Sequence, residues 1–169
     1  KVFKRFDVSK TAFEADAIIN IPKLKTHAMM TLTLGVKNIF GCVPGKRKVS
    51  WHFEAGHDKM AFAKMLVEFY QMLSPRLTIL DGIIGMEGNG PGSGDPREMG
   101  IIAASSDAVA MDVVVSRMVG LEPAELPTTK AAMELGVGET DIEKIEVVGD
   151  AVGMVFESFV LPETVEPRF

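Results

Sequence analysis

The chain has 169 residues, of which 47% are hydrophobic and 24% are charged, so it has enough apolar residues to build the core of one domain. Charges, glycines or prolines interrupt each apolar stretch well before the roughly 18 residues that a membrane span needs. Because no signal-peptide core is present either, we expect a cytoplasmic protein with no membrane partner. The single cysteine, Cys42, excludes an internal disulfide framework and any metal or cluster site made only of this chain's thiolates.

The net charge of −5 is unevenly distributed. Residues 1–60 contain 11 Lys and Arg against 5 Asp and Glu, whereas residues 61–169 contain 7 against 18. A basic N-terminal third is typical either of a solvated basic face or of an anion-binding site. The acidic total charge argues against a nucleic-acid partner, as does the lack of a series of aromatic residues beside the basic segments. The chain begins at Lys1 without an initiator methionine, so we expect it to be a piece of a longer protein.

The first half of the chain predicts two strands and two helices. Strands are expected over 2–8 and over 17–21, and Pro22 ends the second because it cannot donate to a ladder. Apolar periodicity predicts a helix over 31–40 and a longer one over 58–73, whose first residue is an aspartate able to cap it.

The second half continues the alternation. Apolar segments predict strands over 77–80 and 101–104, of the kind buried in a parallel sheet, and over 145–148. Periodic segments predict a helix over 108–119, capped by Asp107, and another over 128–136, which Gly136 ends. A long glycine-rich loop is expected between the first two of these strands.

This alternation predicts the fold class. We expect a single α/β domain over residues 1–150, with helices packed on a mostly parallel or mixed sheet in three layers. Residues 151–169 are expected to form a C-terminal arm that packs on the domain or on a part of the protein outside this chain.

Two lysines and a histidine follow the strand predicted over 17–21, in the segment PKLKTH. Ligands of open α/β sheets bind beyond the carboxyl ends of strands, where we expect this segment to form a loop. Lys23 and Lys25 can bind a carboxylate or phosphate, and His27 can act as an acid, a base or a metal ligand near neutral pH. The alternative is two exposed lysines and a structural histidine.

Lys37 and Asn38 interrupt the apolar segment GVKNIF. A lysine there either extends its amine to solvent or lies partly buried beside an anion, and only burial lowers its pKa enough for base chemistry. Lys46 follows in the basic segment GKRK, which lacks the spacing of a P-loop and is alternatively a solvated turn. Cys42 is expected to be a small buried residue and not a nucleophile.

Six glycines lie between Gly82 and Gly94. Glycine permits positive φ and a close approach of the backbone, so successive amides can form an anion-binding nest. The spacing G-x-G-x-x-G before a helix is missing, which excludes a standard dinucleotide site, and a flexible loop without a ligand is the alternative. The candidate ligand-binding residues of this segment are Gly88, Asn89, Gly90, Gly92 and Gly94.

Three carboxylates are candidates for the same site. Asp81 ends a predicted buried strand and Glu87 lies in the glycine-rich segment, so both are placed for catalysis or metal binding. Asp112 lies among apolar residues of a predicted helix, where an acid needs a partner, and that partner belongs either to the structure or to the site.

Four ordered segments resemble a known family. PKLKTH, VKNIFGCVPGKRK, LDGIIGMEGNGPGSGDPR and SSDAVAMD are similar, in order and spacing, to the bacterial and archaeal family called domain of unknown function 362, over roughly residues 15–150. The resemblance implies an uncharacterised protein, common in anaerobes and often joined to a ferredoxin-like module with two four-iron clusters. With only Cys42 available, any such cluster would lie outside this chain.

A weaker resemblance is to nickel-pincer lactate racemases, because His27, Lys37, Pro44-Gly45-Lys46 and His52 follow a similar order. The pattern of those enzymes is not reproduced residue for residue. The metal, if any, stays unassigned.

The leading hypothesis is an enzyme or enzyme domain that binds an anionic small molecule or cofactor through Lys23, Lys25, Lys37 and the glycine-rich segment. His27 would be the general acid or base, and Asp81 or Glu87 its partner carboxylate. The alternatives are a non-catalytic accessory domain that docks on an iron–sulfur module through an exposed apolar patch, and a nickel-pincer racemase-like enzyme.

Overall fold

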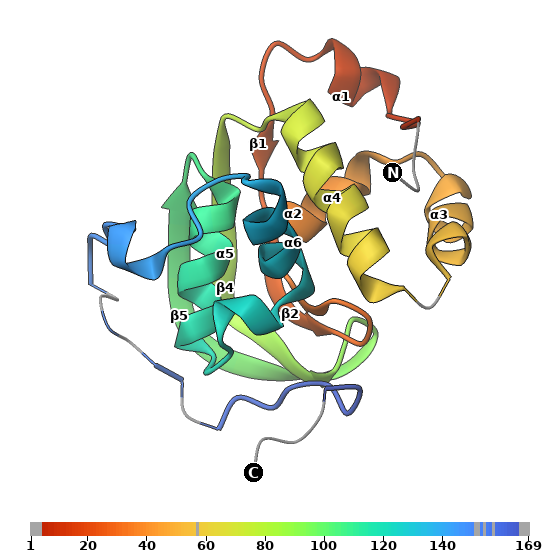
Figure 1. The fold of residues 1–169 in the computed structure, drawn as a ribbon. Helices are drawn as coiled ribbons and strands as arrows, with labels where there is room; N and C mark the ends of the chain where they lie inside the picture. The colour runs from red at the N-terminus through yellow and green to blue at the C-terminus, as the bar shows by residue number, and fades with distance from the viewer. Residues whose placement is uncertain (1–4, 57, 151–152, 154, 157, 166–169) are drawn as a thin grey trace.

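A mixed five-stranded sheet is the centre of the computed structural model, which describes residues 5–56, 58–150, 153, 155–156 and 158–165 (Figure 1). β4 pairs in parallel with β1 and β2 and antiparallel with β5, and β3 pairs antiparallel with β2. The strands are β1 (Ile19–Asn20), β2 (Lys23–His27), β3 (Thr31–Thr33), β4 (Leu77–Asn89) and β5 (Ser93–Ser105).

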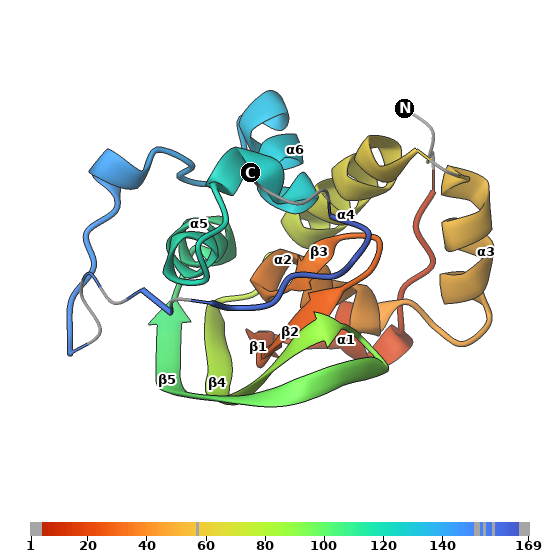
Figure 2. The ribbon, with the colours of Figure 1, turned by 90° about the horizontal axis from the view of Figure 1, so that it is seen from below.

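Helices cover one side of this sheet in two tiers (Figure 2). α2 and α5 contact the strands, and α4 and α6 pack on α2, α5 and each other. The prediction of an α/β fold with helices packed on a mixed sheet in three layers is thus confirmed. The helices are α1 (Lys10–Glu14), α2 (Gly35–Asn38), α3 (Arg47–Ala55), α4 (Lys59–Leu73), α5 (Ala108–Met118) and α6 (Pro127–Leu135). The 3-10 turns are η1 (Ile39–Cys42), η2 (Pro123–Glu125) and η3 (Ile142–Lys144).

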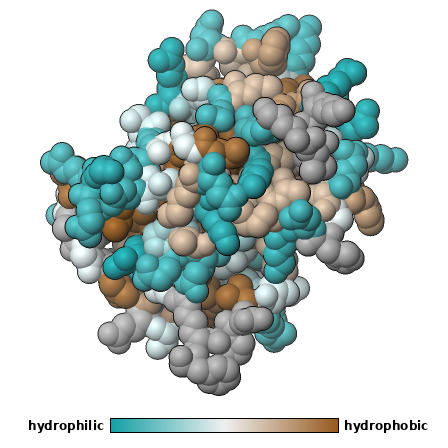
Figure 3. Space-filling view, in the orientation of Figure 1, coloured by the Kyte–Doolittle hydropathy of each residue, from teal (hydrophilic) through white to brown (hydrophobic). Residues whose placement is uncertain are grey.

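Two apolar clusters hold the tiers together. One surrounds α4 and includes Phe62, Phe69 and Trp51, and the other lies between α5 and the sheet, around Leu24 and Leu80. Burial of each large side chain contributes about 1.5–3 kcal/mol. On the outside of the helices, hydrophilic and apolar residues are interspersed (Figure 3), and none of the helices in the described residues is long and apolar enough to cross a membrane.

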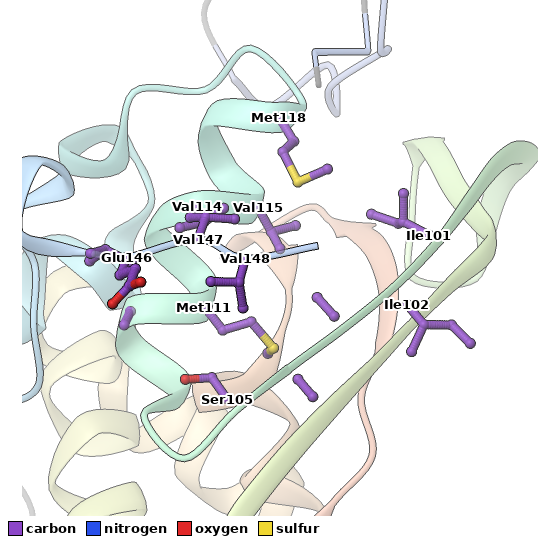
Figure 4. Close-up of a pocket in the computed structure, with 14 residues that line it drawn as sticks. Ile101, Ile102, Ser105, Met111, Val114, Val115, Met118, Glu146, Val147 and Val148 are labelled. Carbon is purple, nitrogen blue, oxygen red and sulfur yellow. The ribbon is translucent and has the colours of Figure 1, made fainter. Parts of the chain in front are cut away.

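The opposite face of the sheet carries exposed isoleucines. Ile19 and Ile21 flank Asn20, and Ile83 and Ile102 lie on β4 and β5; each of these four isoleucines is more than half exposed. Figure 4 shows Ile102 on the side of β5 away from α5. The face therefore carries exposed apolar side chains, and the described helices do not cover it.

The segment predicted as a glycine-rich loop is instead a β-hairpin, formed by residues within β4, the turn and β5. The reason is the lack of space between the two strands. A Cβ on Gly82 would lie 2.6 Å from Cγ1 of Ile101, and one on Gly85 would lie 2.8 Å from Sδ of Met99. Glycine is needed at these positions because neighbouring side chains pack closely against the hairpin backbone, and not because the segment is flexible.

Two further expectations for strands were wrong. Residues 22–27 were expected as a loop, but Leu24 and Thr26 are fully buried while Lys23 lies on the other face, which is the period-two pattern of strand β2. Segments 77–80 and 101–104 were expected to be parallel, but they pair antiparallel within the hairpin.

The expected helix over 31–40 is divided into β3, α2 and η1. Leu34 is extended and buried and precedes the short α2, so the helix begins only at Gly35.

The strand expected over 145–148 is also wrong. This segment pairs with no strand among the described residues and lines, together with α5 and β5, a cavity of about 200 Å³ (Figure 4). Of the strand expected over 2–8, residues 5–8 are irregular, and the remainder lies outside the described residues.

The helix caps follow the local sequence signals. The Asp58 carboxylate accepts a hydrogen bond from the amide of Ala61 at the start of α4, and Asp107 accepts from Val109 and Ala110 at the start of α5. Gly136 ends α6 with a left-handed backbone. These three predictions rested on short-range chemistry and are confirmed.

Part of the C-terminal arm packs on the domain. Phe159 is buried in the cluster beneath α5, the amide of Val160 donates to Glu87 Oε2 at 3.1 Å, and the amide of Gly88 donates to the carbonyl of Val160 at 2.7 Å. The amide of Glu163 donates to Asn89 Oδ1 at 3.1 Å. The described arm residues thus run along the end of the β4–β5 hairpin.

Candidate functional site

A basic pocket of about 300 Å³ lies between the β2–β3 ribbon, the short helix α2 with η1, and helix α3. Lys25 and Thr33 are directly opposite one another in the β2–β3 pairing, so both project into it from the same face. The tip of the β4–β5 hairpin closes one side. The pocket is lined by Lys25, His27, Thr33, Lys37, Asn38, Phe40, Gly41, Lys48, His52 and Pro91.

Lys25, Lys37 and Lys48 all line this pocket, and none of the described residues that line it is an aspartate or glutamate. Ion pairs elsewhere in the described chain join Lys23, Lys64 and other cations to acids, but none of them involves Lys25, Lys37 or Lys48. Like charges in a partly enclosed space repel one another. The described lining of the pocket is therefore rich in positive charge that no ion pair neutralises.

Lys37 is the most buried of the three lysines, with 9% of its surface exposed. Its Nζ lies 5.1 Å from the centroid of the Phe40 ring, a favourable cation–π distance. Burial, reinforced by the charges of Lys25 and Lys48, lowers the pKa of Lys37 to about 8. A substantial fraction of this amine is therefore neutral slightly above pH 7.

The two histidines of the pocket are held as neutral rings. Burial, followed by the charges of Lys37, His52 and Lys25, lowers the pKa of His27 to about 4. Its Nδ1 accepts hydrogen bonds from the amides of Met29 and Met30 at 3.1 and 3.2 Å, so the ring proton is on Nε2. Burial, and next the charge of Lys37, lowers the pKa of His52, whose ring stacks 4.4 Å from Phe62.

Thr33 adds a buried hydroxyl without a partner. Only 6% of its surface is exposed, and its Oγ1 makes no hydrogen bond within the described structure. A buried hydroxyl left unpaired costs free energy unless a ligand or water satisfies it. Thr33 lines the pocket, although its Oγ1 is itself almost fully shielded from solvent.

Helix α2 holds Lys37 in place through a contact with α5. The amides of Gly35 and Val36 donate to the two carboxylate oxygens of Asp112 at 2.7 and 3.0 Å. A Cβ on Gly35 would lie 2.9 Å from that of Ala108, so only glycine allows this approach. Asp112 is therefore a structural cap, and burial, only partly offset by the two amides, raises its pKa to about 7.

Asn38 is held by a second polar contact. Its Nδ2 donates to Asn20 Oδ1 at 2.8 Å, and Asn20 Nδ2 donates to the carbonyl of Gly35 at 2.9 Å. This network joins α2 to β1.

The structure places the other predicted site residues away from this pocket. Lys23 and Asp81 form an exposed ion pair at 2.8 Å, which lowers the pKa of Asp81, on the isoleucine-bearing face of the sheet. Glu87 lies near Arg97 at 3.7 Å and accepts from the C-terminal arm. Lys46 is exposed immediately before α3.

The glycine-rich residues lie in the hairpin. Gly88 and Gly94 face each other in the β4–β5 ladder, and the amide of Gly90 donates to Thr26 Oγ1 at 3.2 Å. Asn89 holds the C-terminal arm, Gly92 is exposed in the turn, and only Pro91 of this segment lines the pocket.

Sequence reasoning named Lys48 only within the basic segment GKRK and His52 only in the racemase resemblance, and it gave Thr33 no role. Lys48 and His52 are four residues apart on α3, so they lie on one helix face, and this spacing was a usable signal. Thr33 gave no such signal, because its place opposite Lys25 depends on the strand pairing.

No group of three or more metal-ligating His, Cys, Asp or Glu residues occurs among the described residues. The cavity beside α5 is also unsuited to an anion: it is lined mainly by aliphatic and methionine side chains, and Figure 4 shows Glu146 at its rim. The basic pocket is therefore the candidate site.

Comparisons with known proteins agree with the resemblance seen in the motifs. The family described as "Domain of unknown function (DUF362)" matches residues 1–117. A "Thylakoid-associated protein" of Synechocystis sp. is 48% identical over 165 residues, which cover 98% of this chain and 51% of that protein. The chain thus spans about half the length of this relative. No solved structure matches the chain.

The cap on α2 predicts a specific pH dependence. The native Asp112 carboxyl keeps its proton up to about pH 7, whereas in the unfolded chain its pKa is 3.8. Between these values the native state binds more protons, so this residue's contribution to the free energy of unfolding falls as pH rises, by a few kcal/mol in all. Urea unfolding of the wild type and of Asp112→Asn across this pH range should show that the free energy of unfolding of the wild type falls, relative to that of the variant, as the pH rises. A difference that stays flat or grows would contradict the assignment.

Proposed function

The chain belongs to the DUF362 family, and from its geometry we propose that the basic pocket binds the carboxylate or phosphate of a small metabolite on which the protein acts as an enzyme. One observation carries the proposal: Lys25, Lys37 and Lys48 line one cavity, and no carboxylate lines it among the residues that the structure describes. Unneutralised like charges destabilise a fold, and a bound oxyanion would remove that cost.

The size of the pocket supports a small ligand. Its volume of about 300 Å³ is at the lower end of the range of roughly 300–1,000 Å³ that small-molecule sites occupy. The Thr33 hydroxyl and the His27 Nε2–H would provide neutral hydrogen-bond donors beside the ammonium groups. Charged and neutral donors together suit a small oxyanion.

The distribution of pKa values supports Lys37 as the group that exchanges protons. With a pKa of about 8, Lys37 can give up and regain a proton near physiological pH, whereas His27, with a pKa of about 4, stays neutral. His27 therefore serves as a hydrogen-bond donor in this proposal. Asp81 and Glu87 lie outside the pocket lining, so no partner carboxylate is assigned.

A thermal-shift titration tests the binding. Phosphate and oxalate at matched ionic strength should raise the melting temperature, and Lys37→Met should remove most of that shift. Lys25→Met and Lys48→Met should each weaken affinity roughly tenfold or more, the usual effect of losing a charged hydrogen bond.

The control is Lys23→Met, two residues from Lys25 on the same strand but paired with Asp81 outside the pocket. It should leave the anion-induced shift unchanged. Stabilisation by no anion, or an equal loss in the Lys23 and Lys37 variants, would contradict the proposal. A shift produced by Ni²⁺ alone would instead favour the racemase-like alternative.

The unpartnered hydroxyl gives a second test. Thr33→Val keeps the shape of the side chain but removes Oγ1, so the ligand-free protein should be as stable as the wild type or slightly more stable. Oxalate affinity, measured by calorimetry, should fall several-fold. Unchanged affinity would mean that the Thr33 hydroxyl does not contact the anion.

A second candidate function rests on the sheet face that bears Ile19, Ile21, Ile83 and Ile102. We propose that this face packs on a further domain of the same polypeptide, because the Synechocystis relative is about twice as long as this chain. Exposed apolar surface of this kind is characteristic of an interface. If that further domain were an iron–sulfur module, this chain would be its accessory domain.

Hydrogen–deuterium exchange tests this second candidate. In the complete Synechocystis protein, the strands equivalent to β4 and β5 should exchange more slowly than in a fragment covering its matched half. Equal exchange in both would contradict docking on this face.

A further inference from the structure

We propose that Lys37 forms an imine with the carbonyl carbon of a 2-oxo carboxylic acid held in the basic pocket. This inference rests on the proposed function, because it requires the pocket to bind the carboxylate. It adds a nucleophile and a substrate class to the site.

The surroundings of Lys37 differ from those of the paired lysines. Lys23 and Lys64 lie 2.8 and 2.7 Å from carboxylate oxygens, and the contact with Glu134 raises the pKa of Lys64. Lys37 has no carboxylate partner among the described residues, and its Nζ lies beside the Phe40 ring in the pocket. No ion pair among the described residues therefore opposes the loss of a proton from the Lys37 amine.

The electrostatics favour the nucleophilic form. Burial and the charges of Lys25 and Lys48 lower the pKa of Lys37 from 10.5 to about 8. A lysine that is desolvated and lies beside other cations is activated for attack on carbonyl carbon. Near pH 7, the neutral fraction of Lys37 exceeds that of an ordinary lysine by roughly two orders of magnitude.

The same lysines specify the substrate class. A 2-oxo acid places its carbonyl carbon one bond from its carboxylate. If Lys25 and Lys48 bind that carboxylate, the carbonyl carbon comes within reach of the third lysine of the same pocket. The Nε2–H of His27 is available to donate to the carbonyl oxygen. A small 2-oxo acid also fits a cavity of about 300 Å³.

The step is balanced without any further reactant. The neutral Nζ attacks the carbonyl carbon, and the carbonyl oxygen takes up a proton as the amine loses one, giving a carbinolamine. The C–O bond then breaks, the oxygen takes the second amine proton and leaves as water, and a C=N bond joins Lys37 to the substrate. No electrons are gained or lost overall.

Reductive trapping tests the inference on the wild-type chain. The protein is incubated with pyruvate and sodium cyanoborohydride near pH 7.5, and the reduced adduct is located by peptide mass spectrometry. We expect labelling of Lys37 to exceed that of the exposed Lys59 and Lys130 by roughly tenfold or more, since only Lys37 lines the pocket that would bind the carboxylate of pyruvate and its pKa is lowered. Acetone, which has the carbonyl but no carboxylate, should label Lys37 far less.

Two variants separate binding from the covalent step. Lys37→Arg keeps a positive charge, so it should retain stabilisation by oxalate while losing the adduct. Lys48→Met keeps the nucleophile but loses a carboxylate contact, so its labelling by pyruvate should fall several-fold.

Equal labelling of Lys37, Lys59 and Lys130 would overturn the inference. So would the absence of an adduct on Lys37 in a protein that oxalate still stabilises, which would leave the anion site standing. If oxalate and phosphate gave no stabilisation and pyruvate no adduct, both the proposed function and this inference would fail.

Discussion

The contact between the Asp112 carboxylate and the start of α2 is the constraint on which the site depends. The carboxylate lies on α5, 77 residues from Gly35, and accepts the first two amides of a four-residue helix. So short a helix is not stable by itself, since it forms few internal hydrogen bonds. The cap, the close approach allowed by Gly35 and the Asn20 network fix the helix that carries Lys37 into the pocket.

The basic pocket shows how the fold maintains an electrostatically unfavourable arrangement of lysines. Lys25 and Lys48 come from β2 and α3, two elements that are separate in sequence, and both raise the electrostatic cost of charging Lys37. Burial of the apolar clusters around α4 and beneath α5 stabilises the fold and offsets this electrostatic cost. Burial and, after it, the same repulsion depress the pKa of Lys37, so the anion affinity and the reactive amine that we propose would depend on the same lysines.

Local chemistry was predictable from the sequence, and long-range pairing was not. The caps at Asp58 and Asp107 and the end at Gly136 follow from residues a few positions apart, and they were predicted correctly. The hairpin was missed because its glycines are explained by neighbouring side chains such as Ile101, which the sequence does not place. Likewise, the common lining by His27 and Lys37 required the β2–β3 ribbon and α2 to meet, and the partner of Asp112 could not be assigned from its own helix.

The most direct test of the account is an anomalous diffraction measurement on crystals grown with selenate, an oxyanion whose position selenium reveals. The account predicts an anomalous peak in the basic pocket, with selenate oxygens within hydrogen-bond distance of Lys37 Nζ and of the Lys25 or Lys48 ammonium group. A pocket without selenate, in which Lys37 is turned to solvent or paired with a carboxylate, would contradict it.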